Sequence, residues 1–255
     1  MTADAVRVRR RRPGRHRTVL LHGLGGGISS WDGFAAHVDA DLELWDAQLP
    51  WHSAGSGRWS RRDDAAAAVA QALAAVPGDP DVVIAHSFAA NLMLELLATK
   101  EIQQPRAVVL VSPFYRPTPE DFTWETAESY LHGLLAILDE GLRVSSGGRL
   151  DDDVRENMAH RLRERIGPYG WVRFFDAYLR SPMVAMDAVR PPVLVVSGRD
   201  DRAARAGDAA ALARSLPDGR SESIADCGHF PMVERPDVFA AVVRHFLTAE
   251  AQDWS

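Results

Sequence analysis

The sequence predicts an α/β fold, because short apolar runs alternate with helix-like segments along most of the chain. Such alternation is typical of a mainly parallel sheet that helices cover on both faces. With 255 residues, 46% of them hydrophobic and 25% charged, the chain is long enough for one large core and has a globular composition. One stretch, from about Tyr115 to Arg190, contains no strand-like run. We therefore expect a core of residues 1–114 and 191–255 with an inserted helical cap of residues 115–190.

Apolar runs that end in polar or glycine-containing loops predict the buried strands of the sheet. They are Thr18–Leu21, Leu42–Trp45, Val82–Ala85, Ala107–Val111 and Pro192–Val196. A shorter run at Ser221–Ile224 predicts a further strand at the edge of the sheet. Ahead of them, Val6–Arg12 and Arg15–Arg17 flank the turn-forming pair Pro13-Gly14, which predicts a hairpin.

Apolar residues at helical spacing predict the helices. In the core these helices are Ala65–Ala75, Phe88–Thr99, Gly207–Ser215 and Pro236–Ala249. In the expected cap, large apolar residues recur every four positions between Val154 and Ile166, which predicts a helix with one buried face. That face consists of Val154, Met158, Leu162 and Ile166. Ten of the 20 aromatic residues lie between residues 114 and 178, and we expect most of them to pack the cap on the core.

The charge balance and the single cysteine exclude several function classes. With 29 basic and 35 acidic residues, the formal net charge is -6, which gives no overall positive field for a nucleic acid. Cys227 alone cannot form an internal disulfide, and no apolar stretch is long enough for a membrane span or a signal peptide. We expect a cytoplasmic protein with no nucleic-acid partner and no membrane span.

Neither a metal nor a cofactor is predicted. No group of His, Cys, Asp and Glu has the spacing of metal ligands. The glycine-rich stretch Gly23–Ile28 follows a strand, but Ile28 stands where a dinucleotide-binding motif needs its third glycine. The one basic cluster, seven arginines between Arg7 and Arg17, predicts an exposed edge hairpin that charge keeps from aggregating. Contact of these arginines with phosphates or lipid head groups is the alternative.

The candidate nucleophile is Ser87, between a predicted strand and the predicted helix Phe88–Thr99. A sharp turn there lifts the hydroxyl above the carboxyl edge of the sheet, where open α/β folds bind ligands. Such a turn needs small residues two positions away on either side, and Ala85 and Ala89 meet that need less well than glycines. The alternative is that Ser87 only caps the helix.

Partners for this serine lie downstream. A serine hydroxyl needs a base to remove its proton and a third group to orient that base. Asp200 and Asp201 follow a predicted strand end, and His229 precedes the last predicted helix. The chain order Ser, Asp, His is that of one fold in particular.

With these motifs in this order, the chain resembles the α/β-hydrolase superfamily, specifically its capped members, which include carboxylesterases and carbon-carbon bond hydrolases. The resemblance spans Val19 to Leu247. It depends on four motifs, Leu21–Gly25, Ala85–Ala89, Gly198–Asp201 and Gly228–Pro236. One departure is Trp51, which stands where relatives carry a glycine near the pocket.

The resemblance implies a role for each site residue. In the family the acid lies three residues past the strand-end glycine, which selects Asp201, with Asp200 as the alternative. The histidine after the glycine of the last motif is the base, which selects His229. The donors of the oxyanion hole would be the backbone N-H groups of Leu24 and Phe88, whose side chains would also line the pocket.

The resemblance implies a cofactor-independent serine hydrolase that cleaves an ester, thioester or activated ketone of a small apolar or aromatic acyl substrate. Met158, Met183 and Met186 would add apolar surface for that substrate. The alternative is a lyase or a cyclising acyltransferase with the same triad. A third possibility is a ligand receptor without catalysis.

Four further polar residues near these motifs have simpler roles in our interpretation. His22 and His86 satisfy local hydrogen bonds, and Asp226 caps a loop. Cys227 is a small buried side chain and not a reactive thiol.

Overall fold

The structure is a computed structural model that describes residues 5–61, 64–99 and 101–250, and it confirms the α/β fold. Within these residues a seven-stranded sheet has the order β1-β3-β2-β4-β5-β6-β7. All neighbouring strands are parallel except β1, which is antiparallel to β3. The strands are β1 (Arg7–Arg12), β2 (His16–Leu21), β3 (Leu42–Gln48), β4 (Val82–His86), β5 (Ala107–Val111), β6 (Val193–Gly198) and β7 (Gly219–Ile224).

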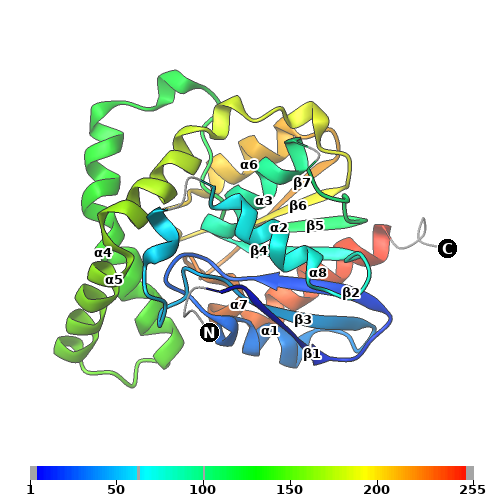
Figure 1. Cartoon of the computed structure of the whole chain (residues 1–255), viewed down its shortest axis with the longest axis horizontal. Helices are drawn as coiled ribbons and strands as arrows, with labels where there is room; N and C mark the ends of the chain where they lie inside the picture. The colour runs from blue at the N-terminus through cyan, green and yellow to red at the C-terminus, as the bar shows by residue number, and fades with distance from the viewer. Residues whose placement is uncertain (1–4, 62–63, 100, 251–255) are drawn as a thin grey trace.

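Helices cover both faces of this sheet (Figure 1). The helices are α1 (Asp32–His37), α2 (Ala66–Ala74), α3 (Phe88–Thr99), α4 (Trp124–Ser146), α5 (Asp152–Leu179), α6 (Ala206–Ser215), α7 (Pro231–Glu234) and α8 (Pro236–Glu250). Successive side chains of a strand point to opposite faces, so Val19 and Leu21 pack toward α2, α3 and α6. Leu20 packs toward α1 and α8 on the other face. Every strand and core helix expected from the sequence is present.

The strand order brings two loops of the candidate site together. The chain passes from β2 to β3 on one side and then returns to β4 on the other side of β2. β2 and β4 are paired directly, with Leu21 opposite Ala85. Ligands of open α/β sheets bind where the strand order reverses in this way, outside the carboxyl ends of the strands. The loops that follow β2 and β4 meet at that point.

The chain between β5 and β6 forms α4 and α5, which lie side by side at one end of the molecule (Figure 1, left). No strand is present among residues 115–190, all of which are described. α5 kinks at Gly167, whose φ of 67° is left-handed, just before Pro168. Together the two helices form what we call the α4–α5 segment, residues 124–179.

The predicted N-terminal hairpin is wrong, because β3 lies between β1 and β2. β1 pairs with β3, and two arginines of β1 form ion pairs with Asp46 of β3. The Nε atoms of Arg9 and Arg11 lie 3.2 and 2.8 Å from the carboxylate of this buried residue. A buried charge needs such partners, and the pairing between distant strands outweighs the local turn at Pro13-Gly14.

The predicted buried face of the cap helix is correct only in part. Ile166 is buried and Leu162 packs in the same small cluster between α4 and α5. Val154 and Met158 are instead 47% and 40% exposed, because the face of α5 that packs on α4 is rotated by one residue and contains Arg155 and Ala159 in their place. None of the described helices combines the length and the apolar character that crossing a lipid bilayer requires.

Candidate active site

Ser87 occupies a sharp turn between β4 and α3. Its φ of 55° lies in the left-handed region, which is strained for a residue with a side chain and is typical of a nucleophile elbow. The turn is fixed by hydrogen bonds at both sides. The N-H of Ser87 donates to the carbonyl of Val111 (2.8 Å), and its own carbonyl accepts from the N-H of Ala90 (2.9 Å). Ala85 and Ala89 are completely buried at this turn, so methyl groups fit where glycines are usual.

A continuous chain of hydrogen bonds joins Ser87, His229 and Asp201. Nε2 of His229 lies 3.1 Å from Oγ of Ser87, and Nδ1 of His229 lies 2.8 Å from Oδ2 of Asp201. All three residues are more than 90% buried. Asp200 does not take part, because its side chain is exposed and its backbone N-H donates to the carbonyl of Cys227. The structure therefore brings together the three residues that the resemblance selects.

Asp201 remains ionised despite its burial. Burial alone would raise the pKa of its carboxyl, but His229 and two backbone N-H groups outweigh this effect and lower the pKa. These N-H groups belong to Ala203 and Ala204, and they donate to Oδ1 at 2.8 and 2.9 Å. Oδ1 is thus anchored to the backbone, while Oδ2 is directed at the histidine.

The loops that carry the aspartate and the histidine approach each other closely. A Cβ atom on Gly198, at the end of β6, would lie 2.0 Å from the carbonyl oxygen of Gly228. Glu234 holds the histidine loop in place, since its two carboxylate oxygens accept hydrogen bonds from the N-H groups of Gly228 and Phe230, each at 2.9 Å. This role of Glu234 was not predicted from the sequence, where its position near the end of the motif Gly228–Pro236 is the only signal for it.

Two buried histidines border the site and bond to backbone atoms. His86 donates from Nε2 to the carbonyl of His229 (2.9 Å), and Nε2 of His22 accepts the N-H of Leu49 (3.1 Å). Nδ1 of His22 then donates to the carbonyl of Gly23 (2.9 Å). Burial lowers the pKa of His22 to about 4 and that of His86 to about 3, so both rings are neutral at pH 7. These contacts agree with structural roles.

The loop after β2 lies against the elbow and carries Leu24. Only glycine fits at position 23, because a Cβ there would lie 2.9 Å from Cβ of Ser87. The N-H of Gly25 donates to the carbonyl of Trp51 (2.9 Å), and Nε1 of Trp51 donates to the carbonyl of His22 (3.1 Å). The unusual tryptophan therefore holds this loop through two hydrogen bonds.

The side chain of Phe88 does not line the candidate pocket, contrary to our expectation. It is completely buried beside Trp51, Trp59 and Phe174, with ring centroids 5.0, 5.9 and 6.1 Å away. Its backbone N-H remains suited to an oxyanion hole, because the first N-H groups of a helix have no acceptor within that helix.

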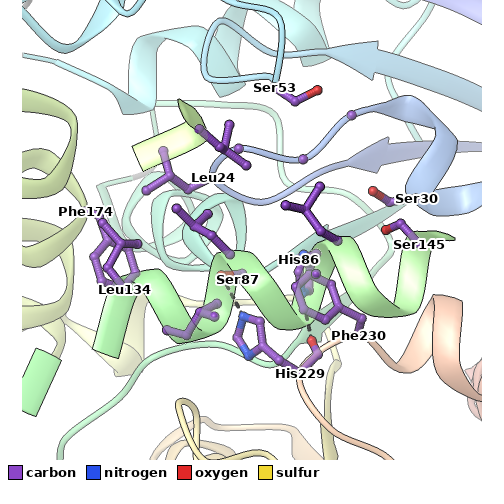
Figure 2. A pocket seen from close by; sticks show the side chains of 18 of the residues that line it. Leu24, Ser30, Ser53, His86, Ser87, Leu134, Ser145, Phe174, His229 and Phe230 are labelled. Atoms are coloured by element: carbon purple, nitrogen blue, oxygen red, sulfur yellow. Dashed lines mark hydrogen bonds between the residues drawn. The ribbon is translucent and has the colours of Figure 1, made fainter. Parts of the chain in front are cut away.

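A cavity of about 200 Å³ opens above Ser87 and His229 (Figure 2). Its wall near the two residues is apolar and comes largely from α4 and α5. The apolar side chains are Leu24, Phe114, Leu134, Ile137, Leu138, Leu142, Leu162, Phe174 and Phe230. Ser30, Ser53 and Ser145 line the part of the cavity farther from Ser87 (Figure 2), and Ser29 is also part of the wall. Among the described residues that line the cavity, none is Asp, Glu, Lys or Arg.

Several expectations about neighbouring residues are corrected or refined. Met158, Met183 and Met186 are absent from the cavity wall, and Met183 is 66% exposed. Cys227 is buried, and burial raises the pKa of its thiol to about 12, which agrees with an unreactive side chain. Asp226 points outward and pairs with Arg235 (3.7 Å). In the described part of the chain, no group of three or more His, Cys, Asp and Glu is arranged to hold a metal ion.

The fold and this site define a class of protein. The Alpha/beta hydrolase family matches residues 18–242, so the chain belongs to this family and is a hydrolase. A curated relative is the pimeloyl-[acyl-carrier protein] methyl ester esterase of Aromatoleum aromaticum, which is 26% identical over 248 residues. The alignment covers 88% of this chain and 95% of that protein.

Solved structures of low sequence identity share the fold. The esterase RhEst1 from Rhodococcus sp. ECU1013 has a TM-score of 0.71 and 20% identity, covering 95% of this chain and 94% of its own. MenH from S. aureus has a TM-score of 0.67 and 14% identity, covering 96% of this chain and 98% of its own. At these identities the likeness shows the fold alone.

Proposed function

We propose that this chain is a cofactor-independent serine carboxylesterase that works through an acyl-enzyme. The observation that carries the proposal is the hydrogen-bonded chain from Ser87 through His229 to Asp201 at the wall of a cavity. In this arrangement Ser87 is the nucleophile, His229 the general base and Asp201 the group that orients and stabilises the imidazolium.

The first half of the reaction transfers the acyl group to the serine. Nε2 of His229 takes the proton from Oγ of Ser87 as this oxygen attacks the ester carbonyl. The carbonyl oxygen becomes an anion, and the N-H groups of Leu24 and Phe88 stabilise it. Each such donor contributes about 100- to 1000-fold in rate. When the carbon-oxygen bond to the alcohol breaks, His229 gives its proton to the leaving oxygen.

The second half releases the acid. A water molecule gives a proton to Nε2 of His229 and attacks the acyl carbonyl. The tetrahedral intermediate collapses, the acid leaves, and His229 returns the proton to Oγ of Ser87. Solvent oxygen thus enters the acid product, whereas the alcohol keeps the ester oxygen.

The substrate in this proposal is a neutral ester with a small apolar acyl group. Charged groups are costly to bury, and the cavity wall offers apolar side chains near Ser87 and serine hydroxyls farther out. The curated relative is named for a methyl ester of a carrier-bound acyl chain, so we include methyl esters in the class. We further propose that residues 115–190 act as a cap on the core, because α4 and α5 supply much of the wall over Ser87.

The test is a panel of p-nitrophenyl and methyl esters with acyl chains graded in length. A monoester of a dicarboxylic acid in the panel probes the effect of charge. The wild-type protein should turn over the neutral esters best, and Ser87→Ala should lower kcat by about a million-fold while the protein stays folded. In heavy-oxygen water the acid product should gain one solvent oxygen. A product that contains no solvent oxygen would instead support a lyase or a cyclising acyltransferase. No turnover of any ester would support a ligand receptor.

A further inference from the structure

We propose that Tyr130 on α4 is a positioning residue, which holds the loop of Asp201 in place and so couples the α4–α5 segment to the triad. This role depends on the proposed function, because it acts through the acid of that triad. Tyr130 itself touches neither Ser87 nor the reacting atoms.

Hydrogen bonds lead from Tyr130 to the nucleophile without a gap. The hydroxyl of Tyr130 donates to the carbonyl of Ala203 at 2.6 Å. The N-H of the same residue, Ala203, donates to Oδ1 of Asp201 at 2.8 Å. Oδ2 of Asp201 then bonds Nδ1 of His229 at 2.8 Å, and Nε2 of His229 lies 3.1 Å from Oγ of Ser87. The carbonyl of Ala203 also shares a peptide unit with the N-H of Ala204, which donates to Oδ1 of Asp201 at 2.9 Å. A shift of Tyr130 is therefore transmitted to the aspartate through the two peptide units that flank Ala203.

The tyrosine is well suited to act as the donor. Burial raises the pKa of its hydroxyl above the ordinary value, so the group remains a neutral phenol at any physiological pH. Its ring is fixed by neighbouring aromatic rings, with centroids 4.8 Å from Tyr178 and 5.9 Å from Phe114. Phe114 also packs beside His229 (5.5 Å), so the cluster spans α4, α5 and the triad.

The hydrogen bond from Tyr130 matters for the loop of Asp201 because few side chains pack on the side of this loop that faces away from Ser87. A second cavity, of about 820 Å³, lies beside it and includes Tyr130, Asp201 and His229 in its wall. Asp200 and Arg202, on either side of the aspartate, are exposed. Where side-chain packing does not fix the position of a loop, a single hydrogen bond to its backbone contributes more to that position.

The test is a double-mutant cycle on kcat with the best ester of the panel, combining Tyr130→Phe with Asp201→Asn. Tyr130→Phe removes only the hydroxyl, and we expect kcat to fall by about 3- to 10-fold, the effect of one hydrogen bond, while KM changes by less than about twofold. In the Asp201→Asn background the same change should have no further effect, since the carboxylate that Tyr130 positions is already lost. The control is Tyr169→Phe, which removes the hydroxyl of a 64% exposed tyrosine on α5 that lines neither cavity.

The outcomes separate this role from the proposed function. If Tyr130→Phe leaves kcat unchanged, or lowers it equally in both backgrounds, Tyr130 does not act through Asp201. If Tyr169→Phe lowers kcat as much, the effect does not depend on the hydrogen bond to Ala203 and the role is again overturned. If Asp201→Asn itself keeps wild-type activity, the triad is wrong and both proposals fail. A downfield proton resonance from the His229 ring, sharp in the wild type and broadened in Tyr130→Phe, would support the role without an activity assay.

Discussion

Oδ2 of Asp201 lies 2.8 Å from Nδ1 of His229, although 28 residues separate the two in the chain. The contact depends on adjacent loops at the carboxyl ends of β6 and β7, which run parallel as neighbours. It distinguishes two consecutive aspartates, since Asp200 faces solvent and Asp201 is 6% exposed. Geometry and motif thus both favour Asp201 over Asp200 as the acid of the proposed triad.

The two aspartates provide a matched pair of variants. Asp201→Asn removes the charge that orients and stabilises the histidine, and we expect kcat to fall by about 10⁴-fold, as in other triads. Asp200→Asn changes an exposed side chain and should alter kcat by less than about twofold. Steady-state kinetics on one chromogenic ester measures both. A larger loss in Asp200→Asn would overturn the assignment of the acid.

Trp51 offers a test of how the pocket loop is supported. Its ring is buried against Phe88 and Trp59, and it bonds the loop that carries Leu24. Trp51→Ala should lower the free energy of unfolding by about 3–5 kcal/mol, because it leaves a large cavity. It should also lower kcat, since the loop loses its anchor. Urea unfolding checks the first effect, and the 87% exposed Trp124 gives a control, for which Trp124→Ala should cost less than about 0.5 kcal/mol.

Glu95 on α3 predicts a pH dependence of stability. Burial raises its pKa from 4.5 to about 7, although Arg180 lies 3.2 Å away, and within the described residues its Oε1 is buried without a hydrogen bond. The unfolded chain releases this proton near pH 4.5 and the folded chain near pH 7, so between these values the native state binds more protons. The contribution of Glu95 to the free energy of unfolding is therefore fully present below pH 4.5 and is lost as pH rises through 7, by up to about 3 kcal/mol.

The variant Glu95→Gln isolates this contribution. Urea unfolding at several pH values should give a flatter curve between pH 4.5 and 7 for Glu95→Gln than for the wild type. The control Glu222→Gln alters an exposed carboxylate on the edge strand β7 and should reproduce the wild-type slope. An identical slope for Glu95→Gln and the wild type would show that Glu95 does not titrate abnormally.

Much of the fold was predictable because its signals are local. Buried parallel strands such as Val82–His86 and Ala107–Val111 are unbroken apolar runs, and the candidate elbow at Ser87 sits between a strand and a helix. The pairing of β1 was not predictable in this way. It depends on β3, whose paired residues lie 32 to 41 positions further along the chain, and on the buried charge of Asp46, whereas the nearby Pro13-Gly14 pair favoured a hairpin.

The sequence contains weaker signals for the residues that support the site. Glu234 and Tyr130 act on backbone groups of loops that are distant or irregular, and no spacing rule predicts such contacts. Asn91 is a further example, since its amide bonds both the N-H and the carbonyl of Phe114. The helical period of α5 gave a wrong prediction for Val154 and Met158, because Ala159 and Arg155, one residue further along, fit the same period and form the packed face instead.

The most direct test of the account is the site at which a fluorophosphonate reacts. Treated protein is digested and the modified peptide is identified by mass spectrometry. We expect one label per chain, on Oγ of Ser87, with no label in Ser87→Ala and much slower labelling in His229→Ala. A protein that hydrolyses esters but carries its label on another residue, or that keeps its activity as Ser87→Ala, would contradict the assignment of Ser87 as the nucleophile.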